Sequence, residues 1–87
     1  MPKHTLSKAF VAGAEAPTDK SKITYTDTLT KGLVLELRRG GGKTFYFRYH
    51  DDHGRQKNIK IGDATAVDLE AAREAAEQHR TTLTLGH

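Results

Sequence analysis

The chain has no cysteine among its 87 residues, and it has no long apolar run. Without cysteine it can form neither disulfides nor thiolate metal sites, and this composition suits the reducing cytoplasm. Its apolar runs are a few residues long, far short of the about 20 residues that span a bilayer. Residues 1–20 also lack the apolar region of a signal peptide. We therefore expect a soluble cytoplasmic protein with no membrane partner.

The length limits what the molecule can do. A chain of 87 residues forms one domain, which we place over residues 1–87. Such a domain buries about 60–65% of the surface that its unfolded chain exposes. That is enough for one thin core, but it leaves no room for a deep catalytic cleft. The size therefore favours a binding module, and we expect neither catalytic residues nor a cofactor.

Positive charge is concentrated in the middle of the sequence, although the formal net charge is only +3. Residues 33–62 hold seven lysines and arginines against three acidic residues, whereas residues 63–87 hold two against five. The middle segment is therefore basic and the final segment acidic. A basic segment favours an anionic partner.

The first third of the chain predicts little regular structure. Apolar residues at helical spacing predict a short helix over residues 5–15, with Thr5 or Ser7 as its N-cap and Pro17 after its end. Residues 16–32 are rich in Thr, Lys, Asp and Ser. This composition predicts a connector that holds at most a short edge strand near residues 23–26.

Residues 33–62 predict a three-stranded antiparallel meander. The segments GLVLELR, KTFYFRYH and RQKNIKIG alternate apolar and polar residues with the period of a half-buried strand. Glycines in RRGGGK, and Gly54 in HDDHGR, provide the positive φ values that tight hairpin turns need. The residues predicted to face the core are Leu33, Leu35, Leu37, Phe45, Phe47, Tyr49, Ile59 and Ile61.

A second helix is predicted over residues 66–80. In DLEAAREAAEQHR, Leu69, Ala72, Ala76 and His79 share one stripe, and Asp68 is a candidate N-cap. This helix would cover the apolar face of the meander. The predicted fold class is α+β, with a three- to four-stranded antiparallel sheet packed against a C-terminal helix and a short N-terminal helix.

The uncovered face of the sheet carries the candidate binding residues. Arg and Lys reach phosphates, while Arg, Asn and Gln make bidentate contacts with purine edges, and a small sheet fits the major groove of duplex DNA. A solvated polar face, which is common in antiparallel sheets, is the alternative interpretation. With the cations at the strand ends, the candidate DNA-binding residues are Arg38, Arg39, Lys43, Thr44, Tyr46, Arg48, His50, Arg55, Gln56, Asn58 and Lys60.

Other motifs fit their chemistry less well. GGKT resembles the end of a phosphate-binding loop, but the first glycine of that motif falls on Leu37, and a strand follows instead of a helix. His50 and His53 lie in a predicted turn without further metal ligands nearby. Asp51 and Asp52 are ordinary turn formers. The tyrosines lie in strand-like segments without the Arg, His and Lys partners that a tyrosine nucleophile needs.

The ordered set of motifs between residues 30 and 76 resembles a known family. The matching pieces are Gly32-Leu33, Lys43-Thr44-Phe45, Phe47-Arg48-Tyr49, Gly54-Arg55, Ile61-Gly62 and Ala72-Arg73. In this order they resemble the amino-terminal arm-type DNA-binding domain of tyrosine recombinases, the integrases of prophages and genomic islands. The segment LSKAFVAGAEAP resembles the opening helix of the same family, so the similarity covers roughly residues 5–80.

Two positions depart from the pattern of that family. After Gly62 the family usually has an aromatic-Pro step and a Ser or Thr cap, where this chain has DATAVD. His50 stands where the family often has Arg, and a histidine gives a weaker cationic contact at neutral pH.

The resemblance implies that the sheet enters the major groove of arm-type sites that flank the recombination core. It also implies that this chain is one part of a tyrosine recombinase in the cytoplasm of a bacterial host, bound to the nucleoid. The partners would then be duplex DNA and the core-binding and catalytic domains of the parent integrase. Residues 81–87 would begin the linker to the next domain, and this domain alone would not cleave DNA. We expect it to be monomeric in isolation.

Two other functions remain open. The order of one helix, three strands and one helix also describes a double-stranded RNA-binding domain. In that fold the last helix begins with basic residues, whereas Asp68 and Glu70 here would repel phosphate. In a protein-interaction module, Tyr46, Arg48 and His50 would contact an acidic partner. Titration with duplex DNA and with RNA distinguishes these functions.

Overall fold

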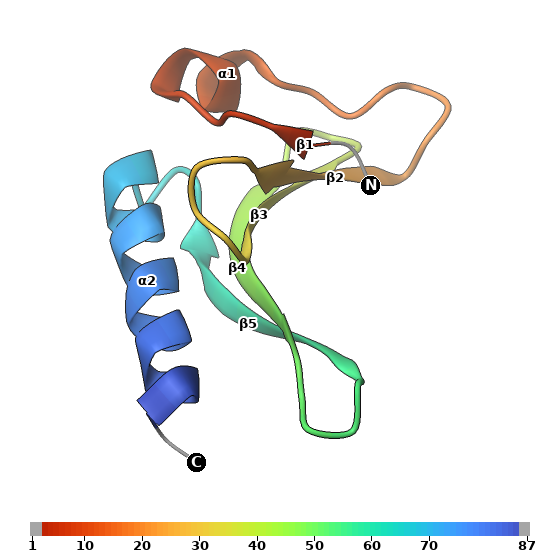
Figure 1. Cartoon of the computed structure of the whole chain (residues 1–87). Helices are drawn as coiled ribbons and strands as arrows, with labels where there is room; N and C mark the ends of the chain where they lie inside the picture. The colour runs from red at the N-terminus through yellow and green to blue at the C-terminus, as the bar shows by residue number, and fades with distance from the viewer. Residues whose placement is uncertain (1–2, 86–87) are drawn as a thin grey trace.

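Residues 3–85, which the computed structural model describes, form five strands and two helices (Figure 1). In chain order the elements are β1 (Lys3–His4), α1 (Lys8–Gly13), β2 (Lys22–Asp27), β3 (Leu33–Arg38), β4 (Lys43–His50), β5 (Gln56–Asp63) and α2 (Leu69–Leu85). The strands make one sheet in the order β1-β2-β3-β4-β5. The predicted α+β class with a C-terminal helix is therefore confirmed. Within these residues, neither helix is long and apolar enough to cross a membrane.

The sheet has more strands than the three or four that the sequence predicts, and it is mixed. β2 to β5 form an antiparallel meander, while β1 pairs in parallel with β2, matching Lys3 with Thr26 and His4 with Asp27. The strand predicted near residues 23–26 is β2, which lies inside the sheet and not at its edge. Sequence analysis misses β1 because two residues cannot show an alternating pattern.

The two faces of the sheet differ as the alternation of residues predicts. The inner face, covered by the helices, has its buried side chains directly opposite one another in neighbouring strands. Leu35 pairs with Phe45, and Leu33 with Phe47, and each of the four is at most 2% exposed. Burial of such a side chain contributes roughly 1.5–3 kcal/mol. The inward phase predicted for β3 and β4 is confirmed.

The N-terminal helix is shorter than the predicted residues 5–15. α1 begins after Ser7, whose Oγ accepts a hydrogen bond from the backbone N–H of Phe10 at 3.1 Å. Ser7 is therefore the N-cap. The ring of Phe10 packs edge-on against that of Tyr25 in β2, with centroids 5.1 Å apart, and Val11 is buried in the core. α1 thereby covers the β2 end of the inner face.

The C-terminal helix covers the rest of the inner face. Asp68 is its N-cap, as predicted, because its Oδ1 accepts a hydrogen bond from the backbone N–H of Ala71 at 2.8 Å. Farther along the helix, the ring of His79 stacks on that of Phe47 with centroids 5.6 Å apart. The stripe predicted from the sequence is the packed face of α2, since two of its alanines are fully buried.

α2 ends later than the predicted residue 80. No glycine or proline occurs between residues 69 and 85, and the helix continues to Leu85. The segment expected to begin a linker at residue 81 is thus helical through residue 85. Residues 86–87 lie outside the described part of the chain.

β4 and β5 form a hairpin that extends beyond the start of β3 (Figure 1). β3 begins at Leu33, opposite Phe47, whereas β4 and β5 stay paired as far as His50 and Gln56. Gly32, immediately before β3, has a φ of 91°, and a Cβ there would lie 2.5 Å from the Phe47 ring. Glycine therefore lets the chain join the sheet at this point. The end of the hairpin projects from the body of the domain.

Candidate nucleic-acid interface

The outer face of the sheet is the side turned away from the helices, and strand register fixes which side chains lie on it. Adjacent strands place these side chains in rows from β2 to β5. The outer-face residues are Lys22, Thr24, Thr26, Val34, Glu36, Arg38, Thr44, Tyr46, Arg48, His50, Gln56, Asn58, Lys60 and Asp63. One half of this face lies on the projecting hairpin, and the other lies toward the turn between β3 and β4.

The half on the hairpin brings six predicted residues together. We call it the hairpin patch: Tyr46 opposite Lys60, Arg48 opposite Asn58, and His50 opposite Gln56. His50 and the three β5 residues are exposed, while Tyr46 and Arg48 are half-buried. The Nε of Arg48 donates a hydrogen bond to Oδ1 of Asn58 at 3.0 Å. The patch contains cationic and amide groups that can contact phosphates and base edges.

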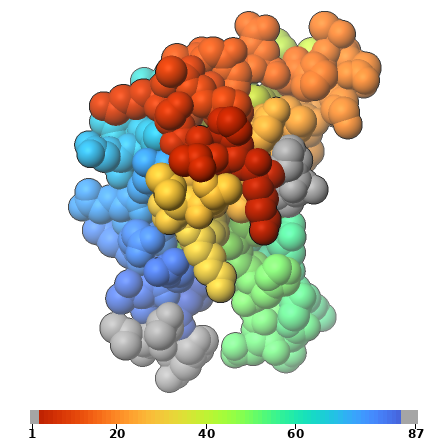
Figure 2. All heavy atoms as spheres, turned by 45° about the horizontal axis from the view of Figure 1, so that its top comes forward, coloured from red at the N-terminus to blue at the C-terminus, as the bar shows by residue number. Residues whose placement is uncertain are grey.

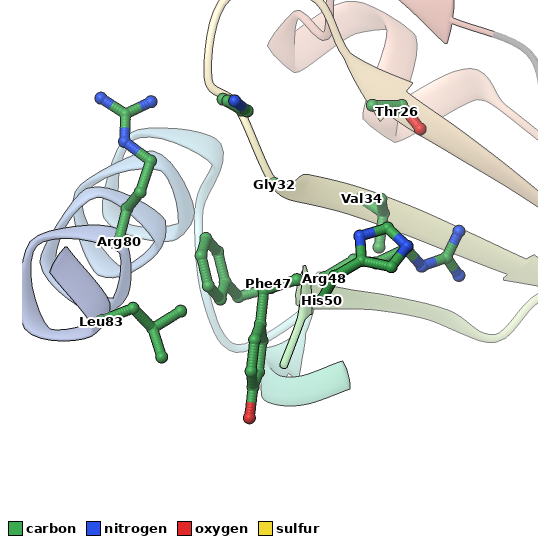
Figure 3. A pocket seen from close by; sticks show the side chains of 10 residues that line it. Thr26, Gly32, Val34, Phe47, Arg48, His50, Arg80 and Leu83 are labelled. Atoms are coloured by element: carbon green, nitrogen blue, oxygen red, sulfur yellow. The ribbon is translucent and has the colours of Figure 1, made fainter. Parts of the chain in front are cut away.

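Neighbouring residues of β4 point to opposite sides of the strand. Figure 3 shows Phe47 on the side of β4 that faces α2, and Arg48 and His50 on the other side. Because side chains alternate along a strand, the same four-residue stretch anchors the core and builds the hairpin patch. A shift of one residue in the register would exchange the two sets.

In the other half of the outer face, charged and polar side chains bind one another. The Glu36 carboxylate accepts a hydrogen bond from Nη1 of Arg38 at 2.8 Å and lies 3.8 Å from Nζ of Lys22. Thr44 is 1% exposed and donates a hydrogen bond to Oδ1 of Asp63 at 3.2 Å. Two candidate DNA-binding residues, Arg38 and Thr44, lie in this half. The structure thus buries the Thr44 hydroxyl and pairs Arg38 with a carboxylate.

A β-bulge places Asp63 on the outer face. The pairing of β4 with β5 shifts between Phe45 and Tyr46, and β5 has one extra residue there, Ile61. Strict alternation from Lys60 would turn Asp63 toward the inner face. The bulge reverses the phase, so the sheet gains a carboxylate on its outer face that the sequence pattern does not predict.

Lys43 does not lie on the outer face, although it is among the predicted DNA contacts. Its Nζ donates hydrogen bonds to the carbonyl oxygens of Val11 and Ala12 at 2.6 and 2.8 Å. Both carbonyls belong to the last turn of α1, where the helix dipole favours a cation. The structure therefore assigns Lys43 to the C-terminal end of α1.

Two other predicted cations lie in hairpin turns. In the β3–β4 turn, Nε of Arg39 donates to the carbonyl oxygen of Lys20 at 3.2 Å. In the β4–β5 turn, the backbone N–H groups of His53 and Arg55 each donate to Oδ1 of Asp51 at 2.9 Å. This geometry confirms Asp51 as a turn former. Arg55 borders the hairpin patch, whereas Arg39 lies at the opposite end of β4.

A buried ion pair joins the start of the chain, β2 and α2. The carboxylate of Asp27 is fully buried, with Oδ2 3.0 Å from Nε of Arg73. Its Oδ1 accepts hydrogen bonds from the backbone N–H groups of Leu6 and Leu29 at 3.1 and 3.3 Å. Nη2 of Arg73 in turn donates to the carbonyl oxygen of Leu6 at 2.7 Å. We call these four residues the Asp27 junction.

The hydrogen bonds of the Asp27 junction keep its carboxylate ionised. Burial by itself raises the pKa of Asp27. The hydrogen bonds from Arg73 and from the backbone of Leu6 and Leu29 favour the charged form, with a smaller contribution from the charge of Arg73. Together they hold the pKa of Asp27 below its ordinary value of 3.8. The junction is therefore a charged, fully hydrogen-bonded part of the fold.

A groove lies between the β4–β5 hairpin and the C-terminal half of α2. Its apolar surface comes from Phe47 and Tyr49 of β4 and Leu83 of α2, and Lys31 and Arg80 also line it. Figure 2 shows this hollow between the blue helix and the green hairpin. Within residues 3–85 there is no group of His, Cys, Asp or Glu residues that could hold a metal ion. Arg48 and His50 of the hairpin patch also line this groove, so the groove and the patch share the β4 edge of the hairpin.

Sequence analysis did not single out several charged residues that the structure brings near the candidate surface. Lys22 lies beside Arg38 on the outer face, and Lys31 and Arg80 line the groove. Lys22 and Lys31 fall in the segment interpreted as a connector, so no face was assigned to them. The alternation in KITYTD was the available signal for Lys22. Asp27 gave no local signal, because its partner lies in a distant helix.

Comparison with known proteins agrees with the motifs. Residues 6–87 match a family model described as Arm DNA-binding domain. A search of curated proteins gives no match. The matched region contains α1, the meander and α2, so it includes the hairpin patch and most of the sheet. The chain belongs to the Arm DNA-binding domain family, the arm-type DNA-binding domain found in phage integrases.

Proposed function

We propose that this domain recognises arm-type sites in duplex DNA as the DNA-binding module of a phage-type integrase, with the hairpin patch inserted in the major groove. Membership of the family supports DNA binding in general. The observation that carries the finer proposal is the hairpin patch. Its cationic and amide side chains alternate along two paired strands, and two of its three rows lie beyond the first residue of β3.

A two-stranded ribbon has dimensions that suit this role. Paired strands lie about 4.8 Å apart, and side chains widen the ribbon toward the about 12 Å of the B-DNA major groove. Both helices pack on the inner face, so the outer face can approach DNA directly. α2, whose first turn carries Glu70, then remains away from the phosphates.

The hairpin patch offers two kinds of contact. Arg48 and Lys60 carry positive charge for phosphates or guanine, and Arg55 adds a cation at the nearby turn. Gln56 and Asn58 carry amides for base edges. The carboxylates of the opposite half of the outer face, Glu36 and Asp63, disfavour phosphate and limit the contact to the hairpin.

In this proposal the domain recognises the DNA site and does not carry out the reaction. The core-binding and catalytic domains of the parent integrase carry out strand cleavage and joining in the cytoplasm of a bacterial host. The isolated domain is a monomer, and DNA carrying several arm-type sites brings copies together.

Titration of labelled duplex DNA, compared with duplex RNA of the same sequence, tests the proposal. Contacts of Arg48, Arg55 and Lys60 with about three phosphates predict that log K falls against log salt with a slope of roughly −3. Lys60→Ala should reduce that slope by about one. Lys43→Met, which changes a lysine on the inner side, is the matched control and should leave it unchanged.

The other outcomes of the titration point to other functions. Equal or tighter binding to duplex RNA contradicts the proposal and supports a double-stranded RNA-binding module. If log K does not depend on log salt for either nucleic acid, the result contradicts DNA binding and supports a protein partner for the hairpin patch.

A further inference from the structure

Two side chains of the hairpin patch form a pair whose geometry restricts what each can read. Arg48 and Asn58 lie directly opposite each other in β4 and β5. The Nε of Arg48 donates to Oδ1 of Asn58 at 3.0 Å. The neighbouring rows of the patch place Tyr46 opposite Lys60 and His50 opposite Gln56. Arg48 is thus held by its cross-strand partner at the centre of the patch.

The hydrogen bond to Asn58 fixes one edge of the guanidinium. Arginine has a long side chain with many rotamers, and ordering it on DNA costs entropy. A partner that holds Nε before DNA binds removes part of that cost. The guanidinium is planar, so fixing its Nε edge also fixes the direction in which the two Nη groups donate. Those two groups can then reach O6 and N7 of guanine together.

The same bond restricts Asn58. To recognise adenine in a bidentate way, an asparagine accepts from N6 with Oδ1 and donates to N7 with Nδ2. Here Oδ1 already accepts from Arg48. An adenine contact by Asn58 would therefore have to be made with the remaining lone pair of Oδ1, in the amide orientation that the bond to Arg48 sets.

We infer that Asn58 is a positioning residue for Arg48, and that the pair reads a single guanine in the target. This inference rests on the proposed function and makes it more specific, since it names one base and the residue that aims at it. Asn58 acts through Arg48 and does not itself select a base.

Selection from a duplex library with a randomised centre identifies the sequence that the wild-type domain prefers. Arg48→Ala should reduce the preference for guanine at one G·C pair by about 5- to 150-fold. Asn58→Ala should weaken the preference at that same pair by about tenfold, because the arginine then loses a hydrogen bond to a charged group. The double variant should be no worse at that pair than Arg48→Ala alone.

Two further variants distinguish positioning from a merely structural role. Asn58→Asp keeps an acceptor for Nε, so it should retain the guanine preference while its added charge lowers affinity for all sequences. Gln56→Ala changes the neighbouring amide of β5 and should leave that G·C pair unaffected. Circular dichroism of each variant confirms that it is folded.

The inference is overturned if the losses from Arg48→Ala and Asn58→Ala multiply in the double variant, because Asn58 would then contact DNA independently. It is also overturned if Asn58→Ala changes the preference at an A·T pair. A library in which the wild type enriches no sequence would contradict the proposed function itself, and this result differs from both of the others.

Discussion

Arg48 and Arg73 show how differently one residue type serves in two regions of this domain. In the hairpin patch, Arg48 is half-buried and donates to the neutral, exposed Asn58. In the Asp27 junction, Arg73 binds a carboxylate that is fully buried and also donates to a backbone carbonyl. The first arginine has a neutral partner at the surface, where DNA can reach the pair. The second arginine stabilises the fold and cannot leave its partner, because the Asp27 carboxylate has no access to water.

Removing Arg73 should cause the largest loss of stability. In Arg73→Ala the Asp27 carboxylate stays buried without its ion-pair partner, and breaking such a pair costs about 3–5 kcal/mol. We expect about 3 kcal/mol, because 27% of the Arg73 side chain is exposed. Urea unfolding followed by circular dichroism measures the free energy of unfolding. The matched control is Arg80→Ala, whose ion pair with Glu77 is exposed and contributes less than about 0.5 kcal/mol. Equal losses in the two variants would contradict the assigned role of the junction.

Removing Arg48 should have the opposite signature. Arg48→Ala should leave the free energy of unfolding nearly unchanged and weaken DNA binding by about 1–3 kcal/mol. Loss of a base contact should relax specificity at one base pair, whereas loss of a phosphate contact should weaken all sequences alike. Fluorescence anisotropy on a preferred and a random duplex measures both. A folded variant that binds both duplexes as the wild type does would place the DNA contact on another surface.

Lys43 sharpens the comparison, because the sequence groups it with the DNA contacts and the structure groups it with the fold. Lys43→Met removes two hydrogen bonds to the end of α1 and should cost about 1 kcal/mol of stability. Thermal unfolding measures this loss. The folded variant should bind DNA at fixed salt with the affinity of the wild type. A clear fall in affinity would show that Lys43 contributes to DNA binding.

Acid unfolding tests the Asp27 junction, because low pH protonates the Asp27 carboxylate. The pKa of Asp27 is lowered in the folded state, so its contribution is present above the ordinary value of 3.8 and is lost as the pH falls below it. In Arg73→Ala only the backbone hydrogen bonds oppose burial, so this pKa rises and acid removes less stability. The difference in unfolding free energy between the two proteins should therefore narrow below about pH 4. A difference that stays constant with pH would show that Arg73 does not act on Asp27.

The alternating segments predicted most of the sheet because burial and strand geometry act over only a few residues. Leu35 and Phe47 were placed on the correct face by period alone. Asp63 could not be placed, since a single bulged residue reverses the phase after it. The Asp27 junction was also out of reach, because Asp27 and Arg73 are 46 positions apart and neither has a local pattern. Long-range polar pairs depend on tertiary packing, which periodicity does not report.

The motifs that revealed the family largely serve its architecture. Gly32 makes room for the Phe47 ring, Lys43 holds the end of α1, and Arg73 binds Asp27. Residues that the motifs leave unspecified, such as Asn58 and Lys60, form much of the hairpin patch. The motifs could therefore identify the scaffold well, but they leave much of the hairpin patch unspecified.

The Asp27 junction also determines when the chain can complete its fold. Leu6 and Arg73 are 67 positions apart, so their hydrogen bond closes a loop nearly as long as the whole domain. The entropy of closing that loop delays the contact. On the ribosome, the Asp27 carboxylate has no guanidinium to receive until α2 has been synthesised. A nascent chain that lacks its final helix therefore holds the Asp27 carboxylate without its ion-pair partner, and it leaves part of the inner face of the sheet uncovered to other chains.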